Sequence, residues 1–347
     1  MTISRRTLLS GSAALLTAAA TGAPKNAVAQ AGGQVVIGTW GGDYGELLRQ
    51  LIDQQFTAQS KIEVLQDIGN NSPRKSKLLA ERQNRRGSMD VSCLSDSDTY
   101  QMMQQNVLDK LATDRIPRLG TVIEALRKDY AVPHIYSAMV ILYNPSKVTT
   151  PPTSYADLWD AKWRGRVGLS DILYNYNTAV AALAGGGSMS DFGPANKRLM
   201  DWRSLDVKIY PSNEALATGL KSEEVWLAPM WLARGYMWKK AGIPLNHVVP
   251  KEGAVPVVYE AAVPRNARNK DNAWRYLNAM LEPQAQIGFA ERMGYVPTVR
   301  DAQLPAELAR EISLTEAQQA TLKTPDHAYL LQHTASILDF WNKDFKG

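Results

Sequence analysis

Aromatic and polar side chains follow three predicted strands, and they are residue types that bind small polar molecules. The groups are Trp40–Tyr44, Ser95–Asp98 and Tyr174–Asn177. Aromatic faces attract cations, and a buried ammonium group needs a carboxylate or another strong acceptor. Because ligands of parallel α/β sheets bind outside the carboxyl ends of the strands, these groups predict one shared binding cleft.

Catalytic and metal chemistry have less support in the residue pattern. The sequence has no G-x-S-x-G elbow, no H-E-x-x-H pair, one Cys, and four His without ligand spacing. No cofactor and no catalytic residue are therefore expected. A dispersed Ser/His/Asp set stays open, because the fold rather than the sequence order assembles such triads. The alternative function is an exported hydrolase-type α/β enzyme.

The strands that position the polar groups alternate with helices. Helices are predicted where apolar residues recur on one face, for example at 271–281. This alternation is typical of an α/β fold with doubly wound, mostly parallel sheets. The predicted strands cover 34–39, 61–65, 89–94, 138–143, 166–170, 207–210, 224–228 and 257–263.

The first 29 residues resemble an export signal in composition. Arg5 and Arg6 precede a short stretch rich in Ala and Ser, and Ala27–Ala29 supplies a small-x-small cleavage site. The pattern predicts a twin-arginine signal peptide over residues 1–29, cleaved near Ala29, and a mature protein in the periplasm. A membrane anchor is not expected, because the apolar stretch is too short to span about 30 Å of hydrocarbon.

Removal of the signal also removes most of the net charge. The 347 residues carry a formal charge of +5, and the signal holds Arg5, Arg6 and Lys25 but no acidic residue. The remaining charge of +2 gives no support for a nucleic-acid partner. The length predicts two domains or one two-lobed unit.

Four short motifs resemble the spermidine/putrescine-binding group of periplasmic binding proteins, which serve ABC importers. Their order and spacing cover most of the mature chain, from about Val35 to Thr298. The motifs are Ser154–Trp159 with Trp163–Gly165, Pro250–Gly253, Ala262–Ala267, and Gly294–Tyr295 with Pro297–Thr298.

The resemblance implies a two-lobed α/β fold that closes on a solute by hinge motion. It also implies delivery of the solute to an inner-membrane ABC permease, and a monomeric receptor. The chain would cross between lobes near His134–Ser137 and again near Val257–Tyr259. The expected lobes are 33–136 plus 259–298, and 137–258 plus 299–347.

The resemblance and the strand-end groups together predict the ligand-binding residues. The group places aromatic residues around the methylenes of a polyamine and carboxylates at its ammonium ends. The predicted residues are Trp40, Asp43, Tyr44, Ser95, Ser97, Tyr136, Asp171, Tyr174, Tyr176, Trp231, Arg234, Tyr259 and Tyr295.

The chain departs from that group where carboxylates are expected. Val257 and Tyr259 stand where the group carries Trp-x-Asp, so its main carboxylate is missing. Asp171 is retained, but only Tyr and Asn follow at Tyr174–Asn177. Glu260 is expected to face away from the cleft, because successive side chains on a strand alternate. The predicted pocket is less acidic than a polyamine pocket.

Two further departures bear on the solute. Ser97 replaces an aromatic residue, and Arg234 replaces a small one, although Arg234 could also lie on a helix surface. The solute is thus either a polyamine-like amine or a zwitterionic or anionic analogue. Tyr174 and Tyr176 leave a ferric-ion-binding relative as a further alternative. The mixed-charge segment 74–86 is expected to be a solvated helix face or part of the surface that meets the permease.

Overall fold

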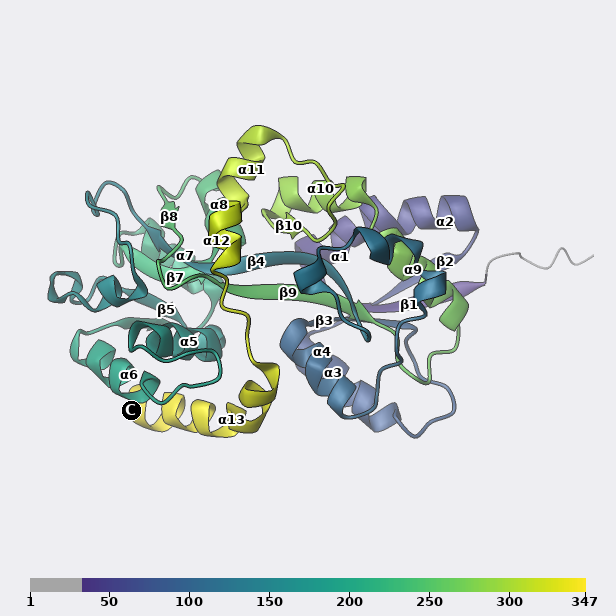
Figure 1. Ribbon diagram of the computed structural model, residues 1–347, viewed down its shortest axis with the longest axis horizontal. Helices are drawn as coiled ribbons and strands as arrows, with labels where there is room; N and C mark the ends of the chain where they lie inside the picture. Colours follow the sequence, from purple (N-terminus) through teal and green to yellow (C-terminus); the bar gives the residue numbers. More distant parts are fainter. Residues whose placement is uncertain (1–32) are drawn as a thin grey trace, which may run out of the picture. The chain divides into compact units, whose positions relative to one another are not determined.

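A mixed β-sheet runs through the computed structural model (Figure 1). The structure describes residues 33–347, so the predicted signal peptide at 1–29 lies outside the described residues. The strands are β1 (Gln34–Thr39), β2 (Glu63–Ile68), β3 (Val91–Ser95), β4 (Val132–Tyr143), β5 (Gly168–Ser170), β6 (Lys208–Tyr210), β7 (Leu227–Trp231), β8 (Asn246–Val248), β9 (Val255–Ala262) and β10 (Val296–Pro297).

The larger sheet has eight strands in the order β10-β4-β9-β3-β1-β2, with β7 and β8 also paired to β4. Strand β1 is parallel to both β2 and β3, and β5 is parallel to β6 in a separate pair. The long strands β4 and β9 are antiparallel to each other, and β9 is antiparallel to β3. The predicted α/β class is confirmed, but the larger sheet is mixed rather than mostly parallel: β1–β3 pair in parallel, whereas β4 pairs antiparallel with β7, β8, β9 and β10.

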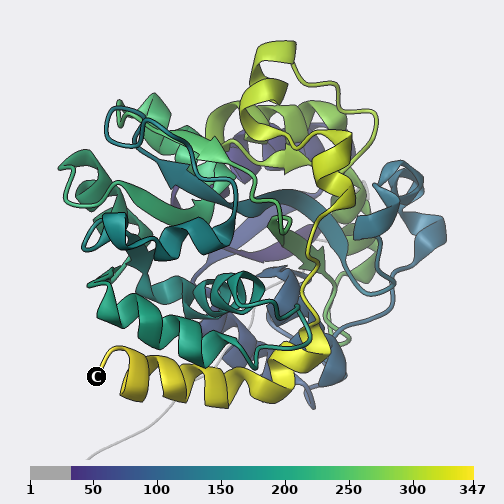
Figure 2. The ribbon, with the colours of Figure 1, turned by 60° about the vertical axis from the view of Figure 1, so that its left-hand side comes forward.

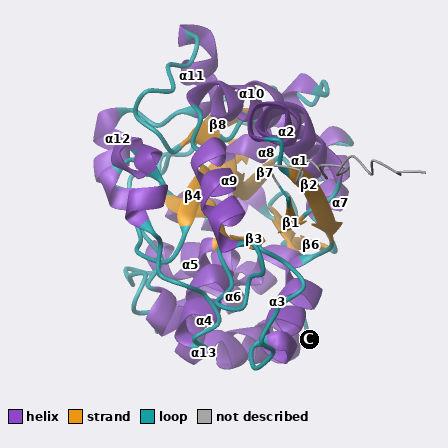
Figure 3. Ribbon diagram, turned by 90° about the vertical axis from the view of Figure 1, so that its right-hand side faces the viewer, coloured by secondary structure: helices purple, strands orange, loops and turns teal. Residues whose placement is uncertain are grey.

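Helices flank the strands, as Figure 3 shows in purple around orange. Most of them alternate with the strands along the chain, whereas α11, α12 and α13 come after the last strand, β10. The α-helices are α1 (Gly42–Leu48), α2 (Gln54–Ser60), α3 (Asn71–Glu81), α4 (Asp96–Gln104), α5 (Tyr174–Ala184), α6 (Ala195–Ser204), α7 (Asn213–Lys221), α8 (Leu232–Lys240), α9 (Lys270–Met280), α10 (Pro283–Met293), α11 (Ala306–Ile312), α12 (Glu316–Ala320) and α13 (His327–Phe340).

Two large hydrophobic cores share the strands β4 and β9. Strand β4 contributes Val132 and Ile135 to one core and residues 138–143 to the other. Strand β9 likewise contributes Ala261 to the first core and Val257 to the second. All residues of β4 are buried, including the polar His134 and Ser137, and its continuous apolar run at 138–143 lies in the second core. The lobe boundaries themselves stay a prediction.

The C-terminal segment packs against the second core. Figure 2 shows α13, in yellow, alongside α5 and α6. Trp341 and Phe345, in the turn that follows α13, are buried in that core. Within residues 33–347, no helix combines the length and the apolar content needed to cross a membrane.

Candidate functional site

A cavity of about 590 Å³ lies at the carboxyl ends of β1 and β2 and reaches β9 and α8. It is the position that the strand-end groups predicted for a ligand. Its walls come from segments far apart in the sequence. The predicted residues that line it are Trp40, Asp43, Tyr44, Arg234, Tyr259 and Tyr295.

The turn after β1 directs Trp40 and Tyr44 to this cavity. Gly42 has a φ of 61°, a conformation that is costly for a residue with a Cβ. A Cβ on Gly45 would lie 2.5 Å from the carbonyl oxygen of Trp40, so glycine is needed for this close approach. The rings of Trp40 and Tyr44 meet edge to face, with centroids 4.9 Å apart.

A buried histidine fixes the ring of Tyr44. The Tyr44 hydroxyl and Nδ1 of His134 share a hydrogen bond of 2.9 Å, and the ring of Phe289 packs against both side chains. Burial lowers the pKa of His134 to about 3, so this imidazole is neutral at physiological pH. His134 is therefore a buried, neutral partner of Tyr44.

Tyr259 stands at the centre of the aromatic wall. Its ring centroid lies 5.2 Å from Trp40, 5.4 Å from Tyr295, and 6.4 Å from both Tyr44 and Trp231. The contacts with Trp40, Tyr295 and Trp231 are edge to face, and the one with Tyr44 is tilted by 45°. Aromatic rings attract one another at such distances. Burial raises the pKa of Tyr259 well above its usual range, so the phenol stays neutral. The wall therefore offers π faces and hydroxyl groups but no negative charge.

Arg74 supports the wall from behind Trp40. Its guanidinium lies 5.1 Å from the centroid of the Trp40 ring and donates to the carbonyl oxygens of Cys93 and Gly69. Arg74 is buried, so the prediction of a solvated face for segment 74–86 is wrong at this residue. The physical reason is that two backbone carbonyls and an aromatic face replace the water that the cation gives up.

Arg234 enters the cavity from the first turn of α8. Its Nη1 lies 3.5 Å from Oε1 of Glu214, whose side chain is 70% exposed. Its Nε is buried and has no hydrogen-bond partner among residues 33–347. The structure thus places Arg234 in the aromatic cavity, although one edge of its guanidinium reaches toward a surface carboxylate.

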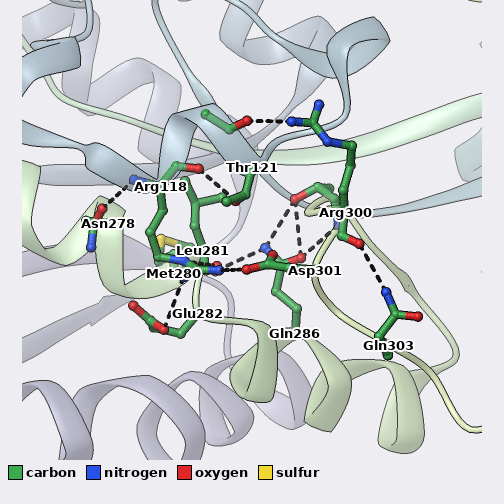
Figure 4. Close-up of polar contacts among 12 residues, drawn as sticks. Arg118, Thr121, Asn278, Met280, Leu281, Glu282, Gln286, Arg300, Asp301 and Gln303 are labelled. Atoms are coloured by element: carbon green, nitrogen blue, oxygen red, sulfur yellow. Dashed lines mark hydrogen bonds and ion pairs between the residues drawn. The ribbon is translucent and has the colours of Figure 1, made fainter.

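The segment that carries Tyr295 is anchored on two sides. The hydroxyl of Thr298 donates to a β4 carbonyl at 2.7 Å, and its N–H donates to Gln286 at 2.8 Å. Nearby, Arg118 donates to the carboxylate of Asp301 at 2.7 Å, which holds the following loop (Figure 4). These contacts give the Gly-Tyr-x-Pro-Thr motif a physical role, which is to fix the position of Tyr295.

Seven predicted residues do not line the cavity, and two of them, Tyr136 and Asp171, are held in other contacts. Tyr136 lies on β4 in an apolar cluster with Ile312, where burial raises its pKa to about 12. Asp171 accepts a hydrogen bond of 2.6 Å from the indole of Trp341 and pairs with Lys346 at 3.0 Å. Tyr136 points away from the cavity because side chains alternate along β4, and its neighbour Ile135 lines the cavity instead. Asp171 is held by its contacts with Trp341 and Lys346 of the C-terminal segment.

The other five lie around α4 and α5 or, in the case of Trp231, at the end of β7 behind the cavity lining. Ser97 and Tyr174 line a second cavity of about 540 Å³, between α3, α4, α5 and α13. Ser95 begins α4, where its hydroxyl donates to the carboxylate of Asp98 at 2.9 Å. Tyr176 packs edge to face on Trp231, with 5.7 Å between centroids, and so extends the aromatic wall.

The cavity also contains residues that were not predicted. Asn70, Ile135 and Met293 line it. Asn70 lies two residues after β2, which ends at Ile68 rather than at the predicted residue 65, so the strand-end rule did not select it. Ile135 and Met293 are apolar residues of ordinary strand and helix patterns, and nothing local distinguishes them from core.

A cluster of buried charges lies apart from the residues that line the cavity. Glu260, fully buried, pairs with Lys128 at 2.6 Å, and its pKa is raised by burial. Burial and the charge of Glu260 raise the pKa of Asp96 to about 7, and Nε2 of His327 lies 3.5 Å from its carboxylate. Glu260 is thus directed away from the cavity lining, as strand alternation predicted. Within residues 33–347, no group of three or more His, Cys, Asp or Glu side chains is placed to hold a metal ion.

The chain is similar to known bacterial binding proteins in sequence. The family model of the bacterial extracellular solute-binding protein matches residues 52–316. The spermidine/putrescine-binding periplasmic protein of Escherichia coli (strain K12) is 26% identical over 253 residues, which are 70% of this chain and 72% of the relative.

Two solved structures share the fold. The structure of the Atu4243–GABA receptor has a TM-score of 0.77 at 23% identity and covers 89% of this chain and 96% of its own. The spermidine/putrescine substrate-binding protein of Streptococcus pneumoniae, solved with calcium and HEPES, has a TM-score of 0.75 at 20% identity, with coverages of 89% and 98%. The predicted two-lobed binding-protein fold class is confirmed.

Proposed function

Because this chain belongs to the family of bacterial extracellular solute-binding proteins, we propose that its aromatic cavity captures a small polar solute for an ABC importer. The role as a solute-binding protein of an ABC transporter follows from the family and its relatives. The observation that supports this cavity as the site is the meeting of four aromatic rings around Tyr259. Such walls bind methylene chains and cations.

Capture would proceed by hinge closure of two lobes, 33–136 plus 259–298 and 137–258 plus 299–347. Support for a hinge comes from β4 and β9, the two strands that both large cores share. A hinge needs only a few connecting residues that absorb the backbone rotation. The cavity takes residues from β9 and α8 as well as from β1, so a closing motion would bring different segments onto one solute.

The solute is a polyamine-like amine or a zwitterionic or anionic analogue. The curated relatives are named for spermidine and putrescine. The cavity shares the aromatic character expected for such solutes but not a set of carboxylates, since Asp43 is its one acidic lining residue in the described chain.

The location and partners are proposed by extension from the relatives, which are periplasmic transport proteins. The mature chain would act as a monomer in the periplasm after twin-arginine export, and it would release its solute to an inner-membrane permease. It would bind without catalysing a reaction and without a cofactor.

A thermal-shift screen tests the receptor function. The panel contains polyamines, amino acids, aminophosphonates and small carboxylates. We expect one class to raise the melting temperature, because a solute at 100 times its Kd stabilises the native state by about 2.7 kcal/mol. The proposal fails if no solute shifts melting while the protein hydrolyses esters or peptides.

Replacing Tyr259 tests the cavity. Tyr259→Ala removes the ring at the centre of the wall, so affinity for the solute found in the screen should fall by roughly 10-fold or more. Tyr259→Phe keeps the ring and should recover most of the affinity. Tyr136→Phe, on the neighbouring strand but outside the cavity, is the matched control. Equal affinity of Tyr259→Ala and the unchanged protein would remove this cavity from the proposal.

A further inference from the structure

Arg234 is the one basic residue that lines the aromatic cavity in the described part of the chain. Its Nε is buried without a hydrogen-bond partner in residues 33–347, and its only ion pair there is the 3.5 Å contact with the exposed Glu214. Exposed pairs of this kind contribute little to stability. The Arg234 side chain is 26% exposed, but its buried Nε–H lacks an acceptor, which is costly unless a ligand supplies one.

A second buried donor lies three residues earlier. The indole Nε1 of Trp231 has no hydrogen-bond partner among residues 33–347, and the side chain is only 7% exposed. Its ring contacts Tyr259, which lines the cavity. An ammonium group has donors and no acceptor, whereas a carboxylate has only acceptors. A solute with an anionic group can therefore supply the acceptor that the Nε of Arg234 lacks, whereas Trp231 lies behind Tyr259 and is not among the residues that line the cavity.

The remaining charge of the cavity is small. Asp43, at the start of α1, is the only acidic side chain among the described lining residues. The phenols of Tyr259 and Tyr295 add no negative charge, because burial raises the pKa of each. A diamine would bring two positive charges to a cavity that holds one carboxylate and one guanidinium. A zwitterion matches both.

We propose that the solute of this cavity is an amino acid whose carboxylate binds the guanidinium of Arg234 and whose ammonium group lies toward Asp43. This inference rests on the proposed function. The methylene chain between the two charged ends packs against the rings of Trp40 and Tyr259. The planar guanidinium suits a carboxylate because it can donate two parallel hydrogen bonds.

Two solute pairs of matched chain length test the charge assignment by isothermal titration calorimetry. γ-Aminobutyrate is compared with putrescine, and δ-aminovalerate with cadaverine, so that each pair differs in one charged end. We expect the amino acid of at least one pair to bind and both diamines to bind at least 10-fold more weakly. Aminophosphonates of similar length show whether another anionic group substitutes for the carboxylate.

Variants of Arg234 assign the anion contact. Arg234→Gln and Arg234→Ala should each lower the affinity for the amino acid by roughly 10- to 100-fold, and Arg234→Lys should retain part of it. Lys240→Gln removes the same charge from the exposed end of the same helix and should change nothing. Glu214→Gln frees Arg234 from its surface partner and should leave affinity equal or higher.

The outcomes separate the two proposals. Binding of diamines with no binding of the amino acids overturns the charge assignment and leaves the receptor function intact. Unchanged affinity in both Arg234→Gln and Arg234→Ala also overturns it. Failure of every solute in the wider panel to bind overturns this inference, and hydrolysis of esters or peptides beside that failure overturns the receptor function as well.

Discussion

Two cationic side chains of this molecule lie near aromatic rings, yet they are paired in opposite ways. Lys128 contacts a fully buried carboxylate, Glu260, at 2.6 Å, and its Nζ lies 5.6 Å from the ring centroid of Tyr130. Arg234 has a buried Nε without a partner in residues 33–347 and a long contact to an exposed Glu214. The first cation has a buried countercharge, whereas the countercharge of the second is 70% exposed.

The difference indicates which of the two cations is available to bind a solute. A buried carboxylate without its cation would strongly destabilise the fold, so the stability of the protein depends on Lys128 as the countercharge of Glu260. The stability of the fold does not depend on Arg234 in this way, because the carboxylate of its partner Glu214 is already solvated. A cation that stability does not require, placed in an aromatic cavity, is best explained by a ligand.

The largest expected effect is on stability, from Lys128→Met. This change leaves Glu260 buried without a countercharge and should lower the free energy of unfolding by about 3 kcal/mol. Arg234→Met should lower it by less than about 1 kcal/mol, because only an exposed pair is lost. Chemical denaturation of the two variants measures the contrast.

A double variant checks the cause. Lys128→Met with Glu260→Leu removes both charges together, so it should recover much of the lost stability. Equal stability of the Lys128 and Arg234 single variants would show that the comparison between the two cations is mistaken.

An intermediate effect is expected on the pH dependence of melting. Burial and Glu260 raise the pKa of Asp96 to about 7, so the folded protein holds this proton more tightly than the unfolded chain does. The stability that Asp96 contributes is present at low pH and is lost as the pH rises from about 4 to about 7. Asp96→Asn stays neutral, so its melting temperature relative to the unchanged protein should rise across that interval by a few degrees.

His327 in the same cluster gives a test of opposite sign. Burial, and to a lesser extent the positive charge of Lys128, lowers the pKa of His327 to about 4. Its contribution is present above the usual histidine pKa of about 6.5 and is lost as the pH falls toward 4. The relative melting temperature of His327→Gln should therefore rise as the pH falls. A flat difference for both variants would contradict the buried-charge interpretation of this cluster.

The sequence predicts the parts of the cavity that depend on local structure. Trp40 and Tyr44 follow a strand and begin a helix, so their position at a sheet edge follows from neighbours in the chain. Tyr295 was found through a motif whose following residues anchor it. Arg234 and Tyr259 were found as departures from the pattern of a resembled group, and both line the cavity.

What the sequence could not predict depends on distant partners. The burial of Arg74 requires the carbonyls of Cys93 and Gly69, which only the folded chain brings together. In a run of mixed charges, Arg74 has no local feature that separates it from the solvated residues. The same limit applies to Tyr136. Alternation along a strand separates its side chains into two faces, but it does not show which of the two faces borders the cavity.

The smallest expected effect concerns Asp171, the acidic residue that the resemblance placed at the ligand. Its carboxylate accepts from Trp341 and pairs with Lys346, both in the C-terminal segment. Asp171→Asn keeps an acceptor for the indole and loses only a partly exposed ion pair, so the free energy of unfolding should fall by about 0.5–1 kcal/mol. Affinity for the solute, measured by calorimetry beside Tyr259→Ala, should stay unchanged. A loss of affinity as large as that of Tyr259→Ala would instead show that Asp171 leaves its C-terminal partners when the solute binds. The site would then use the carboxylate of Asp171 as well as the guanidinium of Arg234 to bind the solute.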